Sequence, residues 1–159
     1  MRSWRRSISR VGRSAARFSE EEFAHLSART LHQLDYAAVR DRLPAGFSEK
    51  LWLAVRGNLA TLADACAWAE VVEGALVPVL EDPTFLAEAA ARLPPEPWTD
   101  ATWKEWTGAL SAATERKGRA LFHPLRLALT ARETGPEMAK LLPLIDRARA
   151  AARLSGTRA

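Results

Sequence analysis

The chain has 159 residues, of which 48% are hydrophobic and 26% are charged, so it is long enough for one globular domain or two small ones. No apolar run approaches the roughly 18 residues of a membrane span, and no apolar segment of a secretory signal follows the N-terminal arginines. The single cysteine, Cys66, excludes a disulfide framework and a cysteine-rich zinc site. A cytoplasmic protein with no membrane partner is therefore expected.

Basic residues are concentrated at the two ends of the chain. Residues 1–17 hold six arginines and no acidic residue, residues 18–115 hold seven basic against sixteen acidic residues, and residues 116–159 hold ten against three. This charge distribution is typical of a protein that binds a polyanion through selected surfaces. An ordinary solvated surface with a basic flexible tail explains it equally well. The composition of the first segment also resembles a mitochondrial presequence, and a basic tail is the favoured interpretation.

Apolar residues follow a helical spacing along the whole chain, and no stretch shows the alternation of a strand. Ser19 and Glu22 have the spacing of a capping box, which predicts a first helix over residues 19–34. Similar start and stop signals predict helices over residues 35–43, 48–56, 61–72, 82–93, 99–110, 137–145 and 146–154. Another helix, entered at Arg119, either starts near Pro124 or bends there, because a proline ring crowds the preceding turn.

The clearest linker is Pro94-Pro95-Glu96-Pro97, because three prolines in four residues cannot lie inside a helix. It divides the chain into a first helical subdomain over residues 18–93 and a second over residues 98–155, preceded by the tail of residues 1–17. The predicted fold class is therefore all-α, built as two small helical subdomains.

The most informative pattern lies in residues 116–145. It consists of the basic cluster Arg116–Arg119, the apolar run Phe122–Leu129, and a Gly135-Pro136 break before Leu141 and Leu142. This pattern resembles the last part of bacterial glutamyl-tRNA synthetases, the part that binds the anticodon and does not carry out the chemistry.

The resemblance covers residues 8–154. Val11–Ser14 is similar to the segment that precedes the anticodon-binding domains, Leu51–Leu59 resembles the first helical cage of the alphaproteobacterial type, and Pro94–Trp98 fits the junction into the second cage. The resemblance implies a class I synthetase anticodon-binding fold and tRNA as partner, namely glutamate tRNA, with glutamine tRNA as an open alternative.

The catalytic signatures of that family have no counterpart in this chain. Neither a His-Ile-Gly-His-like element nor a Lys-Met-Ser-Lys-Ser-like loop is present. The resemblance implies ATP-dependent attachment of glutamate to tRNA for the intact enzyme, whereas this chain alone is expected to be inactive and to need no cofactor. Two positions also depart from the family, because Ala131 and Asp146 stand where glycines are usual. A positive φ there would cost on the order of 1 kcal/mol, unless Asp146 caps a helix instead.

Six residues are candidates for tRNA contacts. Arg56 and Asn58 lie near a predicted helix end and could bond the edges of splayed bases, although a surface arginine and a helix-ending asparagine are the plain alternative. The other four suit phosphate contacts, and they are Lys117, Arg119, Arg126 and Arg132. Arg126 has a structural alternative, in which it holds a carboxylate between two helices. No catalytic or metal-binding residue is predicted.

Two other hypotheses remain open. The chain could dock on a separately encoded synthetase catalytic domain, which predicts an exposed apolar face on residues 18–43. It could also be a stand-alone helical interaction or regulatory protein, or a non-functional synthetase remnant, which predicts tRNA-indifferent association driven by the arginine tail alone.

Overall fold

The computed structural model describes residues 20–159, and every regular element in that range is a helix. The predicted all-α fold is therefore confirmed, whereas the basic segment 1–17 lies outside the described residues. The α-helices are α1 (Glu20–Gln33), α2 (Tyr36–Val39), α3 (Glu49–Val55), α4 (Asp64–Glu73), α5 (Pro83–Ala91), α6 (Thr102–Thr114), α7 (Arg119–Thr130), α8 (Met138–Leu141) and α9 (Arg147–Leu154). Short 3-10 helices extend three of them, namely η1 (Arg40–Arg42), η2 (Arg56–Asn58) and η3 (Leu142–Leu144). None of these described helices is long and apolar enough to cross a membrane.

Three helix starts follow directly from the sequence. Ser48, Asp82 and Asp146 each occupy the N-cap, and the side-chain oxygen of each accepts the backbone N–H three residues later, at distances of 2.7 to 3.1 Å. The prediction that Thr99 caps the next helix is wrong, because α6 begins at Thr102. The Thr99 hydroxyl instead accepts the backbone N–H two residues later at 3.3 Å, within a turn that precedes the helix.

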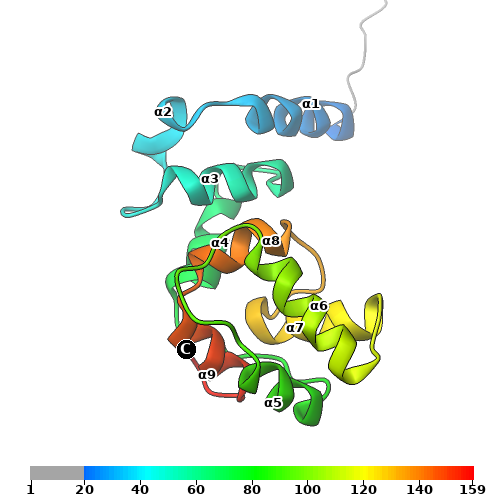
Figure 1. Cartoon of the computed structure of the whole chain (residues 1–159). Coiled ribbons are helices and arrows are strands. Elements are labelled where there is room, and N and C mark those ends of the chain that lie inside the picture. The colour runs from blue at the N-terminus through cyan, green and yellow to red at the C-terminus, as the bar shows by residue number, and fades with distance from the viewer. Residues whose placement is uncertain (1–19) are drawn as a thin grey trace, which may run out of the picture.

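The helices are arranged around one continuous apolar core (Figure 1). α1, α2 and α3 lie at one end of the molecule and α5 and α9 at the other, with α4 and α8 between them. Trp52 and Trp106 are fully buried within this core and Trp68 nearly so, as their helical spacing among aliphatic residues indicates.

Residues 94–97 run as coil between α5 and α6, as three prolines require. α5, which precedes this coil, packs mainly on α9, which follows it. Trp98 is half-buried against the core, and its indole N–H donates to the Pro94 carbonyl at 3.1 Å. The division into two subdomains at this linker stays a prediction.

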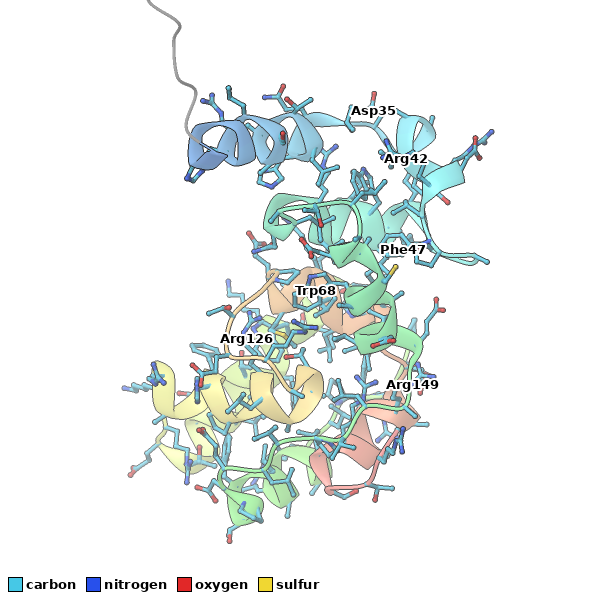
Figure 2. All side chains as sticks on the ribbon, turned by 180° about the vertical axis from the view of Figure 1, so that it is seen from behind. Asp35, Arg42, Phe47, Trp68, Arg126 and Arg149 are labelled. Carbon is cyan, nitrogen blue, oxygen red and sulfur yellow. The ribbon has the colours of Figure 1, made fainter. Side chains whose placement is uncertain are left out.

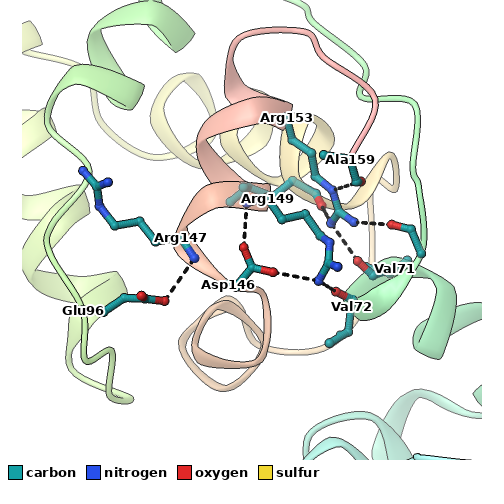
Figure 3. Close-up of polar contacts among 10 residues, drawn as sticks. Val71, Val72, Glu96, Asp146, Arg147, Arg149, Arg153 and Ala159 are labelled. Carbon is teal, nitrogen blue, oxygen red and sulfur yellow. Dashed lines mark hydrogen bonds and ion pairs between the residues drawn. The ribbon is translucent and has the colours of Figure 1, made fainter.

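The fully buried Arg153 joins α9 to three other segments through four backbone oxygens (Figure 3). Its Nη1 donates to the Val71 and Leu129 oxygens at 2.7 and 2.8 Å, its Nη2 to Gly74 at 3.0 Å and its Nε to Ala159 at 2.8 Å. No Asp or Glu side chain in the described range forms a salt bridge with this guanidinium, and burial lowers its pKa to about 10. α9 is therefore fixed to the ends of α4 and α7 by a charged group that donates to the neutral carbonyls of Val71, Gly74 and Leu129.

α7 begins at Arg119, ahead of Pro124, so the alternative of a start near the proline is wrong. Gly118 at its N-cap has a φ of 54°, and the helix ends at Ala131, which is left-handed with a φ of 52°. The Ala131 N–H donates to the Leu127 carbonyl at 2.8 Å, which closes the last turn. The second departure from the family is harmless, because Asp146 has a φ of −66° and caps α9.

Replacing Ala131 by glycine is expected to raise the free energy of unfolding by about 0.5–1 kcal/mol. Glycine removes the left-handed strain of about 1–2 kcal/mol and loses part of this gain through the greater entropy of the unfolded chain. Urea denaturation measures the change. Ala112→Gly, at an exposed position of α6, is the control and should lower stability by about 1 kcal/mol. Equal losses in both variants would contradict a strained Ala131.

Candidate functional site

Two neighbouring pockets share one residue, Glu137, and together contain half of the predicted contact residues. The first pocket, of about 240 Å³, lies between the ends of α1 and α3 and the start of α8, and it is lined by His32, Leu53, Ala54, Arg56, Gly57, Asn58, Glu137 and Lys140. The second, of about 330 Å³, is lined by Trp103, Phe122, Arg126, Glu137, Met138 and Ala139. We call the two pockets together the Glu137 surface.

Arg126 is a half-buried cation of this surface. Its side chain lies beside the loop that leads from α7 to α8 (Figure 2), and its Nη2 donates to the Pro136 carbonyl at 2.9 Å. Its Nη1 is buried and has no hydrogen-bond partner among the described residues. Burial lowers the Arg126 pKa, and no described carboxylate forms a salt bridge with it. In place of the carboxylate of the structural alternative, Arg126 bonds a backbone carbonyl, and its Nη1 has no partner among the described residues.

Aromatic side chains form the wall next to Arg126. Phe122 precedes Arg126 by four residues on α7, is 44% exposed, and lies 6.2 Å from the Trp103 ring, centroid to centroid. Trp103 also meets Trp106 edge to face at 5.8 Å. Because Trp106 is buried and Trp103 is only half-buried, Trp103 connects the core to the pocket. An exposed aromatic face beside a cation suits a flat, polar ligand.

Arg56 and Asn58 lie in the same pocket, on the single turn of η2. Arg56 is half-buried, and its Nη1 donates to the Leu34 carbonyl at 3.0 Å, an oxygen that also accepts the Trp52 indole N–H at 2.9 Å. Arg56 therefore joins η2 to the end of α1, a structural contact that its alternative as a plain surface arginine did not include. Asn58 is exposed at the pocket edge.

Lys140 adds a cation to this pocket that the sequence reasoning missed. It forms an exposed ion pair with Glu137 at 3.4 Å. Such a pair contributes little to stability, of the order of 0–1 kcal/mol, so both groups can exchange partners when a ligand binds.

Lys117 and Arg119 lie apart from the Glu137 surface. Lys117 is exposed in the turn between α6 and α7. Arg119 lines another pocket, where its Nη2 lies 3.3 Å from His123 Nε2, and His123 Nδ1 lies 2.8 Å from the Glu81 carboxylate. Arg116, in the same turn, forms an ion pair with Asp82 at 2.6 Å. Among the described residues, Lys117 forms no ion pair and Arg119 contacts only His123, so these two cations remain available to a ligand.

Arg132 lies over the Trp68 ring, with its guanidinium carbon 5.1 Å from the ring centroid. The Trp68 ring also packs directly against Gly135, since a Cβ at Gly135 would lie 2.3 Å from a ring carbon. Arg132 therefore helps to hold the loop between α7 and α8 on the core, while its side chain remains exposed.

The structure thus separates the six predicted residues. Arg56, Asn58 and Arg126 meet around Glu137, while the other three lie outside those two pockets. The sequence reasoning missed Trp103, Phe122, Glu137 and Lys140. The spacing of four between Phe122 and Arg126 could have indicated one shared helix face, but no sequence signal places Glu137 beside η2.

The chain resembles known proteins over nearly its whole length. Residues 49–158 match the family described as "Anticodon binding domain". Glutamate--tRNA ligase 2 of Beijerinckia indica subsp. indica is 57% identical, over 94% of this chain and 34% of its own length. Glutamate--tRNA ligase 2 of Gluconacetobacter diazotrophicus is 49% identical, over 92% of this chain and 34% of its own length. The chain therefore spans about a third of the length of these relatives.

A solved structure shares the fold. The crystal structure of glutamate-tRNA synthetase from Elizabethkingia anophelis superposes with a TM-score of 0.68 at 16% identity, over 86% of this chain and 31% of that one. Because an anticodon is part of a tRNA, the matched family gives tRNA as the class of partner and does not favour the interaction-protein alternative. The chain belongs to the anticodon-binding domain family, and it corresponds to the C-terminal anticodon-binding region of the glutamate--tRNA ligases that it matches.

Proposed function

We propose that this chain recognises the anticodon loop of glutamate tRNA for a glutamate--tRNA ligase, and that the loop lies on the Glu137 surface. In the complete ligase, glutamate is attached to the tRNA at the expense of ATP, and this region selects the tRNA. The region itself needs no cofactor for that role. Glutamine tRNA remains the alternative substrate of the same surface.

One observation carries the proposal, namely the Arg126 guanidinium, whose Nη1 has no partner among the described residues, beside the exposed Phe122 and the half-buried Trp103. A splayed base offers a flat face for the two aromatic side chains, and its carbonyl or ring nitrogen can accept from the guanidinium. A buried charged donor without a partner is unfavourable, so a ligand whose acceptor bonds Nη1 after a rotation of the side chain regains that free energy on binding.

The first pocket provides groups for a second base. The Asn58 amide can donate and accept at a base edge, Glu137 can accept from an exocyclic amino group, and Lys140 can bond a carbonyl or a phosphate. Arg56 supports this pocket by fixing η2 against α1 and offers its remaining donors to the RNA.

The remaining cations suit the phosphate backbone. Lys117 and Arg119 lie at the N-terminal end of α7 and Arg132 at its C-terminal end, so contacts there position the RNA without reading its sequence. We assign direct base contacts to the Glu137 surface and phosphate contacts to these three residues.

Two variants test this assignment. Replacing both Lys117 and Arg119 by alanine is expected to weaken the binding of all tRNAs alike. It should also reduce the slope of log affinity against log salt by about 1 for each phosphate that is no longer neutralised. Asn58→Ala should weaken the binding of glutamate tRNA and leave that slope nearly unchanged. Fluorescence titrations from low to physiological salt, with an unrelated tRNA as the control ligand, measure both effects. A salt slope that falls in Asn58→Ala but not in the double variant would contradict the assignment.

A further inference from the structure

A cluster of charged side chains surrounds His123, a residue to which the proposed tRNA contacts give no role. His123 lies one turn after Arg119 on α7, and both line a pocket of about 470 Å³. The His123 side chain is only 14% exposed, whereas Arg119 is exposed. The other charged residues of the lining are Glu81, Asp82 and Arg116. We call these five residues the His123 cluster.

The contacts of the His123 ring determine which nitrogen carries its proton. Nδ1 lies 2.8 Å from the Glu81 carboxylate, and an ionised carboxylate only accepts hydrogen bonds, so Nδ1 carries the proton and donates it. In the neutral ring, Nε2 is then a bare acceptor. It lies 3.3 Å from Arg119 Nη2, which donates to it. Neutral His123 therefore joins a carboxylate on one side to a guanidinium on the other.

A second proton on the ring breaks one of these contacts and keeps the other. The charged ring donates from both nitrogens, so Nδ1 keeps its bond to Glu81, whereas Nε2 no longer accepts from Arg119. The two adjacent cations then repel each other, and the exposed guanidinium can turn away from the ring. Histidine is the side chain whose charge changes between about pH 5 and pH 8. Protonation thus releases Arg119 and places a second charged donor beside it.

The remaining two residues of the His123 cluster do not contact the ring. Arg116 and Asp82 form an ion pair with each other at 2.6 Å, and the Asp82 side chain also caps α5. The charged groups in contact with the ring are therefore Glu81 at Nδ1 and Arg119 at Nε2. A ligand that bridges the released guanidinium and the charged ring must offer several acceptor oxygens and a negative charge. A phosphate group has this chemistry.

We propose that Arg119 and protonated His123 form a proton-dependent site for a phosphate group of the tRNA backbone. The inference rests on the proposed function, in which Arg119 contacts a phosphate, and it adds His123 as the residue that controls this contact. At high pH the guanidinium bonds the neutral ring, and at low pH a phosphate oxygen accepts from both side chains. tRNA is therefore bound more tightly, and with more phosphate contacts, as the pH falls.

Fluorescence titrations of the full chain with glutamate tRNA, in a salt series at pH 8 and at pH 6, test the proposal. At physiological salt the parent should bind about fivefold more tightly at pH 6, and its slope of log affinity against log salt should steepen by about 1. His123→Gln has a neutral side chain at both pH values, so its affinity should change by less than about twofold and its slope should stay constant. His25→Gln, at an exposed position of α1, is the matched control and should behave like the parent.

A second variant keeps the test decisive if His123→Gln does not fold. Arg119→Ala changes an exposed side chain, and its loss of affinity should be about threefold larger at pH 6 than at pH 8, because the neutral ring already bonds this guanidinium. Equal losses at the two pH values would overturn the proposal. A folded His123→Gln variant with the pH dependence of the parent would also overturn it.

Nitrogen-15 NMR of the chain without tRNA tests the state of the ring independently of RNA binding. At pH 8 the His123 ring should carry its proton on Nδ1, and a proton on Nε2 instead would overturn the proposal. If the parent binds glutamate tRNA no better than an unrelated tRNA, the proposed function fails, while the pH dependence of either tRNA still decides the phosphate site. Selective binding of glutamate tRNA without any steepening of the slope contradicts the proton-dependent site alone.

Discussion

Replacing Arg153 by methionine is expected to lower the free energy of unfolding by about 3 kcal/mol or more. Methionine fills a similar volume but leaves the Val71 and Leu129 carbonyls without their donor, while the Gly74 carbonyl keeps only the Leu76 N–H at 3.1 Å. A buried unsatisfied acceptor costs about 1–3 kcal/mol. The gain from no longer burying a charge opposes this loss. The loss of stability dominates, because the guanidinium is a shared partner of α4, α7 and α9, whereas the neighbouring Arg149 bond to the Val72 carbonyl joins only α9 and α4.

Urea and thermal denaturation measure the effect of the Arg153 change. Arg158→Met is the matched control, because Arg158 is exposed and makes one bond, to the Ala75 carbonyl at 3.0 Å. It should lower stability by about 1 kcal/mol or less. If Arg153→Met were as stable as the parent, burial of the charge would outweigh the carbonyl bonds, and the role of Arg153 as the link between α9, α4 and α7 would be wrong.

Replacing Arg126 by alanine is expected to weaken binding of glutamate tRNA at least tenfold. The variant loses the charged donor of the second pocket and the bond that holds the Pro136 carbonyl, so the surface loses both a base-binding group and its support. The cost to folding should be smaller, about 1 kcal/mol, because only one neutral acceptor loses its donor. Binding and urea denaturation of the same sample separate the two effects.

Two further variants decide how Arg126 acts. Arg126→Lys keeps the charge but not the planar fork, and should recover only part of the affinity. Arg92→Ala removes an exposed arginine at the C-cap of α5 that pairs with Glu88 and lies outside both pockets, and should leave tRNA binding within twofold of the parent. Equal losses in Arg126→Ala and Arg92→Ala would mean that only net charge matters, which would contradict base contact by Arg126.

The local features of the fold could be predicted from the sequence because they depend on neighbouring residues. Ser48, Asp82 and Asp146 cap helices through bonds that span three residues, and such patterns are visible in the sequence alone. The same reasoning wrongly predicted a cap at Thr99, because the Thr99 hydroxyl accepts a backbone N–H within the turn that precedes α6.

The site could be predicted only in part. Arg126 stands out in the sequence because an arginine within an apolar helix is unusual, but its partner is a carbonyl brought in by the following loop. Glu137 joins two pockets because α8 packs beside α3, and nothing in the sequence fixes that contact between segments about eighty residues apart. Arg153 would be expected on the exposed face of a short basic helix, and only the packing of α9 buries it.

The most direct test of anticodon recognition compares glutamate tRNA with the same tRNA carrying an exchanged anticodon. The titrations are made at physiological salt, with the full chain and with residues 18–159. Within each chain, the anticodon exchange keeps the phosphate backbone and changes only the bases that the Glu137 surface meets. At least tenfold weaker binding of the exchanged tRNA, in both chains, is the result predicted here. Equal affinity for the two tRNAs, or selectivity that disappears with residues 1–17, would contradict anticodon recognition by this surface.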